Sequence, residues 1–476
     1  MSNEDNSRQL SMDFTPAGKI NRFADALHNG RFVLAVEAPA PEVGSPDPAP
    51  APEQLAALEN EVMRIGGLDT VLVIPDRGSA WRGIEHAIEL PVENRDRHLV
   101  YLSGAGTSHS EAERLVRLAD SCALTNLVAV SGDAPYKCPV RECRRLEFTG
   151  SDELLRLCCE HGLHTGVVTN PFQYTPGTQW GQLLKLDRRI AGGAEFIVTQ
   201  CGWDMLKLQS LAWYLASHSE YTPRIARLML LSPPRIERIL KNCCPGVRIS
   251  DDFRRHLEHE LSYSKAQFES AQYRRLELQV AGCRLMGFSG VQIVGAETPA
   301  RVRIVSNRIR QALEEFTDFQ QWLEEYNSYL GSADMSPIPE GYQLYDRMLY
   351  RDMPENGPIG INPPGEPEAT AWERTMLKVR KFFFRHADEE SPGHARMLKK
   401  LLVSCRGCGR CRLRANSYVC PETCPKRLAE GPCGGVRADG SCELDPELEC
   451  VHVRATRCAM LLDELAGPAA DTRSGC

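Results

Sequence analysis

Eight short runs rich in β-branched and apolar residues recur up to Val294, and longer segments with helical periodicity lie between them. This alternation is typical of βαβ units and a parallel sheet. The expected strands are Phe32–Val36, Thr70–Ile74, Leu99–Leu102, Asn126–Val130, Thr165–Thr169, Phe196–Thr199, Arg224–Leu230 and Gly290–Val294. The clearest helical patterns are Ser110–Ala119, Asp152–His161, Thr178–Gly192 and Phe253–Met286. Eight parallel strands with crossovers close most economically as a (β/α)8 TIM barrel, and an open doubly wound sheet is the alternative.

The chain has 476 residues, which is more than one hydrophobic core usually organises, so we expect smaller units beside the barrel. The expected division is an N-terminal arm (1–29), the barrel (30–330), a linker and helical wrap (331–400) and a cysteine-rich domain (401–476). The Pro-rich segment 39–52 is expected to be a surface loop, because proline interrupts both helices and β-ladders.

Composition excludes several functional classes. The formal net charge of -7 offers nucleic acid no basic surface. The sequence contains no apolar run of about 18 residues, the length that a membrane helix needs. Its polar start, MSNEDNSRQLSMDF, lacks the apolar segment of a signal peptide. We therefore expect a cytoplasmic protein with no membrane or nucleic-acid partner.

Polar residues follow several of the expected strands, at the barrel end where chemistry collects. These residues are Glu37, Asp133, Asn170, Gln200 and Asp204. A carboxylate beside an apolar ligand can have its pKa raised by desolvation and act as a general acid. Carboxylates at such positions also serve as helix N-caps, so the constellation carries more weight than any single member.

Two further residues fit a ligand site at the same end. Gly132 allows the backbone to approach a ligand closely, and Trp203 offers a flat apolar surface to a ring.

The segments VEAPAP, VAVSGDAPY and TNPFQYTPGTQWGQLLKLDRRIAGGAEFIVTQCGWD resemble the methylenetetrahydrofolate reductase family, over about residues 30 to 310. The resemblance implies a flavin on the C-terminal face of the barrel. It also implies reduction of 5,10-methylenetetrahydrofolate to 5-methyltetrahydrofolate by hydride transfer. Glu37 would be the general acid that opens the methylene bridge, Asp133 would hydrogen-bond the pterin, and Gln200 would orient it.

The resemblance also implies binding residues. Flavin contacts would come from His98, Gly132, Asp133, Thr169, Asn170, Gln173, Arg188 and Arg189. Folate contacts would come from Asp133, Gln200, Trp203 and Asp204.

The chain departs from the family pattern at positions that touch flavin. Ala38 stands where the family has aromatic residues, Ser131 replaces a basic residue, and 169–173 (TNPFQ) replaces the family's loop after strand five. FAD and FMN both stay open for these reasons. The electron source, NAD(P)H or a redox partner protein, stays open as well, and so does a homo-oligomer.

Ten of the 19 cysteines lie between Cys405 and Cys476. Their short spacings, C-x2-C-x2-C and C-x3-C, suit thiolate ligands around zinc or an iron–sulfur cluster. The predicted ligands are Cys405, Cys408, Cys411, Cys420, Cys424, Cys433, Cys442 and Cys450. The run PETCPKRLAEGPCGG resembles the C-terminal domain attached to some methylenetetrahydrofolate reductases. Unligated buried thiols are the structural alternative.

Two other functions remain open at this point. A tetrahydrofolate-dependent methyltransferase or demethylase partner needs no flavin and no acid at the methylene bridge. A non-catalytic assembly subunit would combine a degenerate barrel with a cysteine domain that docks a redox partner.

Overall fold

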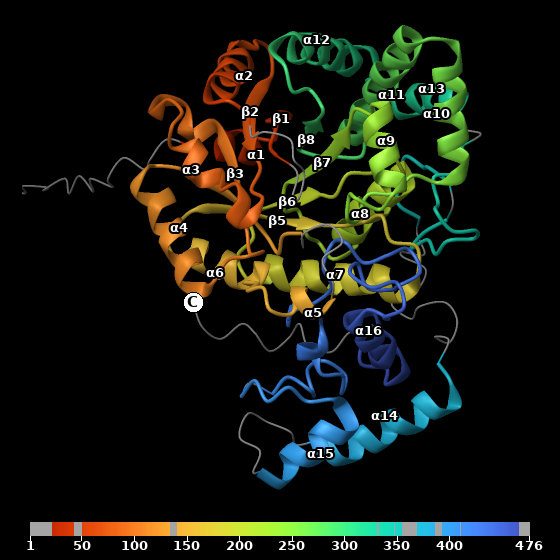
Figure 1. Cartoon of the computed structure of the whole chain (residues 1–476). Helices are drawn as coiled ribbons and strands as arrows, with labels where there is room; N and C mark the ends of the chain where they lie inside the picture. Colours follow the sequence, from red (N-terminus) through yellow and green to blue (C-terminus); the bar gives the residue numbers. More distant parts are fainter. Residues whose placement is uncertain are drawn as a thin grey trace, which may run out of the picture.

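The computed structural model describes residues 21–41, 50–133, 140–330, 333–346, 348–354, 369–385, 393–409 and 411–465. Its eight strands are parallel and form one closed barrel in chain order, with β8 paired to β1 (Figure 1). They are β1 Val33–Glu37, β2 Asp69–Ile74, β3 His98–Ser103, β4 Asn126–Val130, β5 His164–Thr169, β6 Phe196–Thr199, β7 Arg224–Met229 and β8 Gly290–Val294. The predicted (β/α)8 barrel is confirmed, and the open sheet is excluded.

Helices surround the strands and continue into a second unit (Figure 1). Those up to residue 330 are α1 Arg22–His28, α2 Pro52–Arg64, α3 Gly83–Ala87, α4 His109–Ser121, α5 Val140–Cys143, α6 Ser151–Glu160, α7 Pro176–Ala191, α8 Met205–Ser217, α9 Pro233–Leu240, α10 Asp251–Tyr263, α11 Lys265–Leu285, α12 Pro299–Glu315 and α13 Phe319–Leu330. Those beyond are α14 Ala371–Phe384, α15 Gly393–Val403 and α16 Val451–Leu461.

The barrel has an inner and an outer apolar layer. Along β1, Val33 and Ala35 belong to the inner layer, whereas Leu34 and Val36 pack toward the helices. This alternation follows from the two-residue period of a strand. Glu37 continues the inward set, so the last residue of β1 points into the barrel at its C-terminal end.

Helix α1 closes the opposite, N-terminal end. Phe23 packs edge-on against Phe196 and His164, which begin β6 and β5, with ring centroids 5.2 and 5.5 Å away. Residues 22–28 therefore belong to the barrel rather than to a separate arm. Residues 1–20 of the expected arm, and residues 42–49 of the expected Pro-rich loop, lie outside the described residues.

The long helix expected over Phe253–Met286 is wrong in one respect. Two helices, α10 and α11, occupy this segment, and Ser264 between them has an extended backbone (φ -171°, ψ 158°). The Ser264 hydroxyl accepts a hydrogen bond from the Gln267 amide, which is the usual N-cap arrangement. Because the break contains no proline or glycine, apolar periodicity alone does not reveal it.

The described residues between 369 and 465 form the second unit, which we call the C-terminal lobe. Its own apolar core includes Leu377, Phe384 and Val419. Helix α16 lies along α7 of the barrel (Figure 1), and Ala459 and Met460 join the barrel's outer core. The lobe is therefore packed against the barrel. None of the helices that the structure describes is both long and apolar enough to cross a membrane.

Candidate functional site

The C-terminal ends of the strands and the lobe enclose a cavity of about 120 Å³, which we call the mouth cavity. Barrel and lobe both supply polar groups to it. The residues that matter most below are Asp76, Arg77, Asp133, Lys185, Gln200, Arg227, Lys426 and Glu443. Sequence reasoning placed two of these, Asp133 and Gln200, in a site, and the structure brings them to the same cavity.

Glu37 is paired with an arginine that sequence reasoning missed. Arg227, on β7, donates from Nε and Nη2 to both carboxylate oxygens of Glu37, at 2.7 to 2.9 Å. Both side chains are largely buried. Both oxygens of Glu37 are therefore engaged by the guanidinium, in the bidentate geometry that arginine and carboxylate favour.

The ion pair lies in a larger hydrogen-bonded network. Gln292 Nε2 donates to Glu37 at 2.6 Å, and the Tyr101 hydroxyl donates to Gln292 Oε1 at 3.0 Å. Arg227 also donates to Gln200 Oε1 at 3.3 Å. Burial would lower the pKa of Arg227, but Cys201 and Glu37 nearby raise it above its ordinary value. The network therefore joins the floor of the barrel mouth to Gln200.

The turn after β4 places Asp133 at the cavity. Gly132 has φ +76°, and a Cβ there would lie 2.1 Å from Ser103 Oγ, so only glycine fits. Asp133 is exposed to the mouth cavity, and barrel and lobe atoms enclose that cavity and limit the water around the carboxyl group. The resulting desolvation raises the pKa of Asp133, and the charge of Glu443 raises it further. Asp133 thus keeps its proton to higher pH than an ordinary aspartate.

Asp76 and Arg77 follow β2 and also line the cavity, and sequence reasoning missed both. Burial raises the pKa of Asp76 to about 7, against hydrogen bonds from the amides of Gly78 and Gly83. Arg77 Nε is buried without a hydrogen-bond partner in the part of the chain that the structure describes. The sequence could have indicated them, because IPDRG places an aspartate just after the second strand, as SGD does after the fourth.

Five donors of the barrel bind backbone carbonyls of the lobe segment 430–436. Asn170 donates to Gly434 (2.7 Å), Gln182 to Cys433 (2.9 Å), Lys185 to Pro432 (2.9 Å), Arg188 to Glu430 (2.5 Å) and Arg248 to Val436. Burial lowers the pKa of Lys185 to about 7. Arg189, on the same helix, is engaged by Asp152 and by the Val168 carbonyl. The lobe therefore covers the mouth through its main chain.

The flavin expectation does not fit this arrangement. Asn170 and Arg188, two of the expected flavin contacts, donate to lobe carbonyls instead. With the lobe in place, neither of these two side chains is available to a flavin.

The expected cofactor contact His98 lies at the wrong end of the barrel. It is the first residue of β3, fully buried, and its Nε2 is 2.8 Å from Glu59 Oε1. The N-terminal ends of the strands lie opposite the mouth. His98 therefore does not bind a ligand there, and its environment indicates a structural role.

Four other expected contacts do not line the mouth cavity. Trp203 packs against Phe253, and Asp204 caps α8 by accepting from the Leu206 amide at 3.1 Å. Thr169 is buried in β5. Both amide atoms of Gln173 are buried and have no hydrogen-bond partner among the described residues.

The lobe thiols lie in two neighbourhoods. Burial raises the pKa of Cys420, and nearby Cys405 and Cys408 raise it further. Burial likewise raises the pKa of Cys450 to about 12, with Cys424 and Cys442 close by. Cys411 accepts from Lys399 Nζ at 3.4 Å, and Cys433 donates to Glu443 at 3.2 Å. Among the described residues, however, no three Cys, His, Asp or Glu side chains converge on a common metal position. The zinc or iron–sulfur centre stays a prediction.

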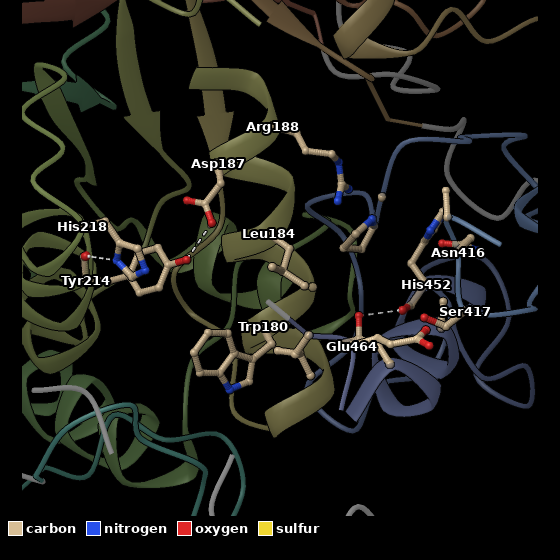
Figure 2. Close-up of a pocket in the computed structure, with 18 residues that line it drawn as sticks. Trp180, Leu184, Asp187, Arg188, Tyr214, His218, Asn416, Ser417, His452 and Glu464 are labelled. Atoms are coloured by element: carbon tan, nitrogen blue, oxygen red, sulfur yellow. Dashed lines mark hydrogen bonds between the residues drawn. The ribbon is translucent and has the colours of Figure 1, made fainter. Parts of the chain in front are cut away.

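A second cavity, of about 260 Å³, lies between α7, α8 and the lobe (Figure 2). Trp180, Tyr214 and Arg188 line its barrel side, and Asn416 and His452 line its lobe side. The Tyr214 hydroxyl donates to Asp187 at 2.7 Å. Arg188, expected to contact a flavin, therefore lies at this interface and does not line the mouth cavity.

Comparisons with known proteins concern the two units separately. Residues 384–467 match the family described as "Methylene-tetrahydrofolate reductase C terminal". No curated relative matches the chain at a significant level.

Three solved structures resemble the barrel. An uncharacterized protein from Clostridium thermocellum, described as binding two copies of 5-methyl-5,6,7,8-tetrahydrofolic acid, has 15% identity and a TM-score of 0.41, over 60% of this chain and 97% of that one. An Aquifex aeolicus protein has 10% identity and a TM-score of 0.36, over 63% and 100%. Yersinia pestis dihydropteroate synthase has 9% identity and a TM-score of 0.33, over 60% and 93%. Similarity at this level carries no functional argument.

Proposed function

We propose that this chain binds a reduced folate at the barrel mouth and reduces the bridge of 5,10-methylenetetrahydrofolate to a methyl group. One observation carries the proposal: the unit that matches the reductase C-terminal family forms a wall of the cavity that Asp133, Gln200 and Arg227, the partner of Glu37, also line. The family match and the strand-end residues, found independently, thus concern one site.

The reaction needs a proton and a hydride. Protonation of one bridge nitrogen opens the ring to an iminium ion, and hydride addition to its carbon gives the methyl group. We assign the proton to Asp133, because it lines the cavity and its pKa is raised, whereas Glu37 does not line the cavity and both of its oxygens accept from Arg227. Glu37, which accepts from Gln292, instead holds Arg227, and Arg227 in turn orients the Gln200 amide.

The hydride would come from a dihydronicotinamide or dihydroflavin. A flavin would need the segment 430–436 to leave the donors Asn170 and Arg188 first. For that reason, the arrangement in which the lobe is bound to the barrel supports folate binding more directly than it supports a resident flavin.

The test is turnover by the purified full chain, prepared without oxygen. We expect consumption of methylenetetrahydrofolate with NADH or reduced FMN, and formation of 5-methyltetrahydrofolate. Asp133→Asn should lower kcat by about 10²- to 10⁴-fold, and the rate of the wild type should fall as pH rises through the raised pKa of Asp133. Glu113→Gln, an exposed change on α4, is the matched control. Full activity of Asp133→Asn would remove the proton assignment.

A second candidate is methyl transfer from 5-methyltetrahydrofolate without a flavin. The observation that favours it is the engagement of the expected flavin donors by lobe carbonyls. Loss of the methyl group from 5-methyltetrahydrofolate to an added thiol, in a colourless preparation without redox reagents, would support it over reduction.

A further inference from the structure

Lys426 of the lobe reaches into the mouth cavity across 294 residues of sequence. Its Nζ donates to the Gly132 carbonyl oxygen at 3.2 Å and to both carboxylate oxygens of Glu443 at 2.8 Å. The Lys426 and Glu443 side chains are only 3% and 7% exposed. The cation thus holds the backbone of the turn that carries Asp133.

Glycines at close approaches permit this arrangement. A Cβ on Gly435 would lie 2.1 Å from Glu443 Oε2, so a side chain there would displace the counter-ion of Lys426. Gly246 has φ +76°, and a Cβ on it would lie 2.3 Å from the Gly434 carbonyl oxygen. Glycines on both the barrel and the lobe therefore allow the close packing around the Lys426–Glu443 pair.

Stability alone does not account for a buried ion pair here. Desolvating two charges costs about as much as their attraction returns, so such pairs add little net stability over apolar residues of the same size. A hydrogen bond from a charged donor to the Gly132 carbonyl does fix the direction in which the following residue, Asp133, points.

We propose that Lys426 is a positioning residue of the barrel site: with Glu443 as its counter-ion, it holds the Gly132–Asp133 turn so that the Asp133 carboxyl faces the ligand. The proposal rests on the proposed folate function. It makes the lobe a working part of the site, and it assigns the lobe a task that needs neither flavin nor metal.

The test compares three changes at the pair with one control, all in the full chain. Lys426→Met removes the donor but leaves Glu443 buried and unpaired. Lys426→Met combined with Glu443→Gln removes both charges, so the lobe keeps its fold without an orphaned charge. Lys426→Arg keeps a donor. Lys381→Met breaks an exposed ion pair with Glu464 elsewhere in the lobe and serves as the control.

Two readouts are measured: affinity for 5-methyltetrahydrofolate by calorimetry, and hydrogen exchange of the peptide that contains residues 130–133. We expect the double variant to bind about ten-fold more weakly, equivalent to about 1.4 kcal/mol, and to exchange faster in the turn. Lys426→Arg should restore most of the affinity, and Lys381→Met should match the wild type.

The outcomes separate the two proposals. Unchanged affinity and unchanged exchange in the double variant would overturn the positioning role. If the wild type binds no folate, the proposed function fails, and the exchange of the turn alone then decides whether Lys426 positions it. Should Lys426→Met fail to fold, the double variant and Lys426→Arg still give the answer.

Discussion

The two ends of the barrel both bury polar side chains, but they use them differently. At the N-terminal end, His98 bonds to Glu59 and His164 bonds to Asn126 beneath α1. Burial lowers the pKa of His164 to about 4, so that ring is neutral at pH 7. At the C-terminal end, Arg227, which is paired with Glu37, and Asp133 line an open cavity. A buried polar residue therefore suggests chemistry only where it has a cavity beside it.

The largest expected effect is at the mouth network. Arg227→Met leaves the Glu37 carboxylate buried without its guanidinium, which should cost about 3 to 5 kcal/mol of unfolding free energy. Urea unfolding measures this loss. Combining it with Glu37→Gln should recover most of the stability, because no buried charge is left. Equal stability of the single and double variants would contradict the pairing.

The next largest effect is the change of folding stability with pH, and its sign differs between the two ends of the barrel. The pKa of Asp76 in the folded chain is about 7, well above its ordinary value, so its contribution to stability is full below about pH 4 and is lost as pH rises through 7. That loss should amount to a few kcal/mol. The pKa of His164 is lowered, so its contribution is full above about pH 6.5 and is lost as pH falls through 4.

The midpoint of urea unfolding, measured between pH 4 and 8, tests the loss of stability with rising pH that we assign to Asp76. Asp76→Asn should flatten the decline toward pH 8, whereas Asp251→Asn, at an exposed position, should leave the profile as it is. A wild type whose stability stays constant from pH 5 to 8 would refute the assignment to Asp76.

The smallest effect is at the N-terminal end. Phe23→Leu removes ring contacts with Phe196 and His164 and should cost about 1 to 2 kcal/mol. Affinity for 5-methyltetrahydrofolate should not change, since α1 lies at the end opposite the mouth. A matching loss of affinity would mean that the two ends are coupled.

The sequence specifies the strands better than the site. Asn126–Val130, Phe196–Thr199 and Gly290–Val294 have the same bounds in the sequence interpretation and in the structure, because turn residues flank short apolar runs. The site residues Asp133 and Gln200 were predictable for the same reason, since each follows a strand.

Two of the residues that were missed lie inside strands. Arg227 and Gln292 are polar residues with apolar neighbours on both sides, in IARLM and GVQIV, and they lie at inward positions. The sequence does not show which partner such a residue has, because only closure of the barrel brings β7 and β8 beside Glu37. The role of Lys426 was not predictable, since nothing local links the lobe to the β4 turn.

The separation of 294 residues between Lys426 and Gly132 has a consequence for biosynthesis. At about 5 to 20 residues per second, a ribosome needs roughly 15 to 60 s to go from one to the other. The nascent barrel therefore waits with its mouth uncovered and its turn untethered until translation of the lobe is nearly finished. A chain truncated by early termination after β8 would expose that surface to chaperones and proteases.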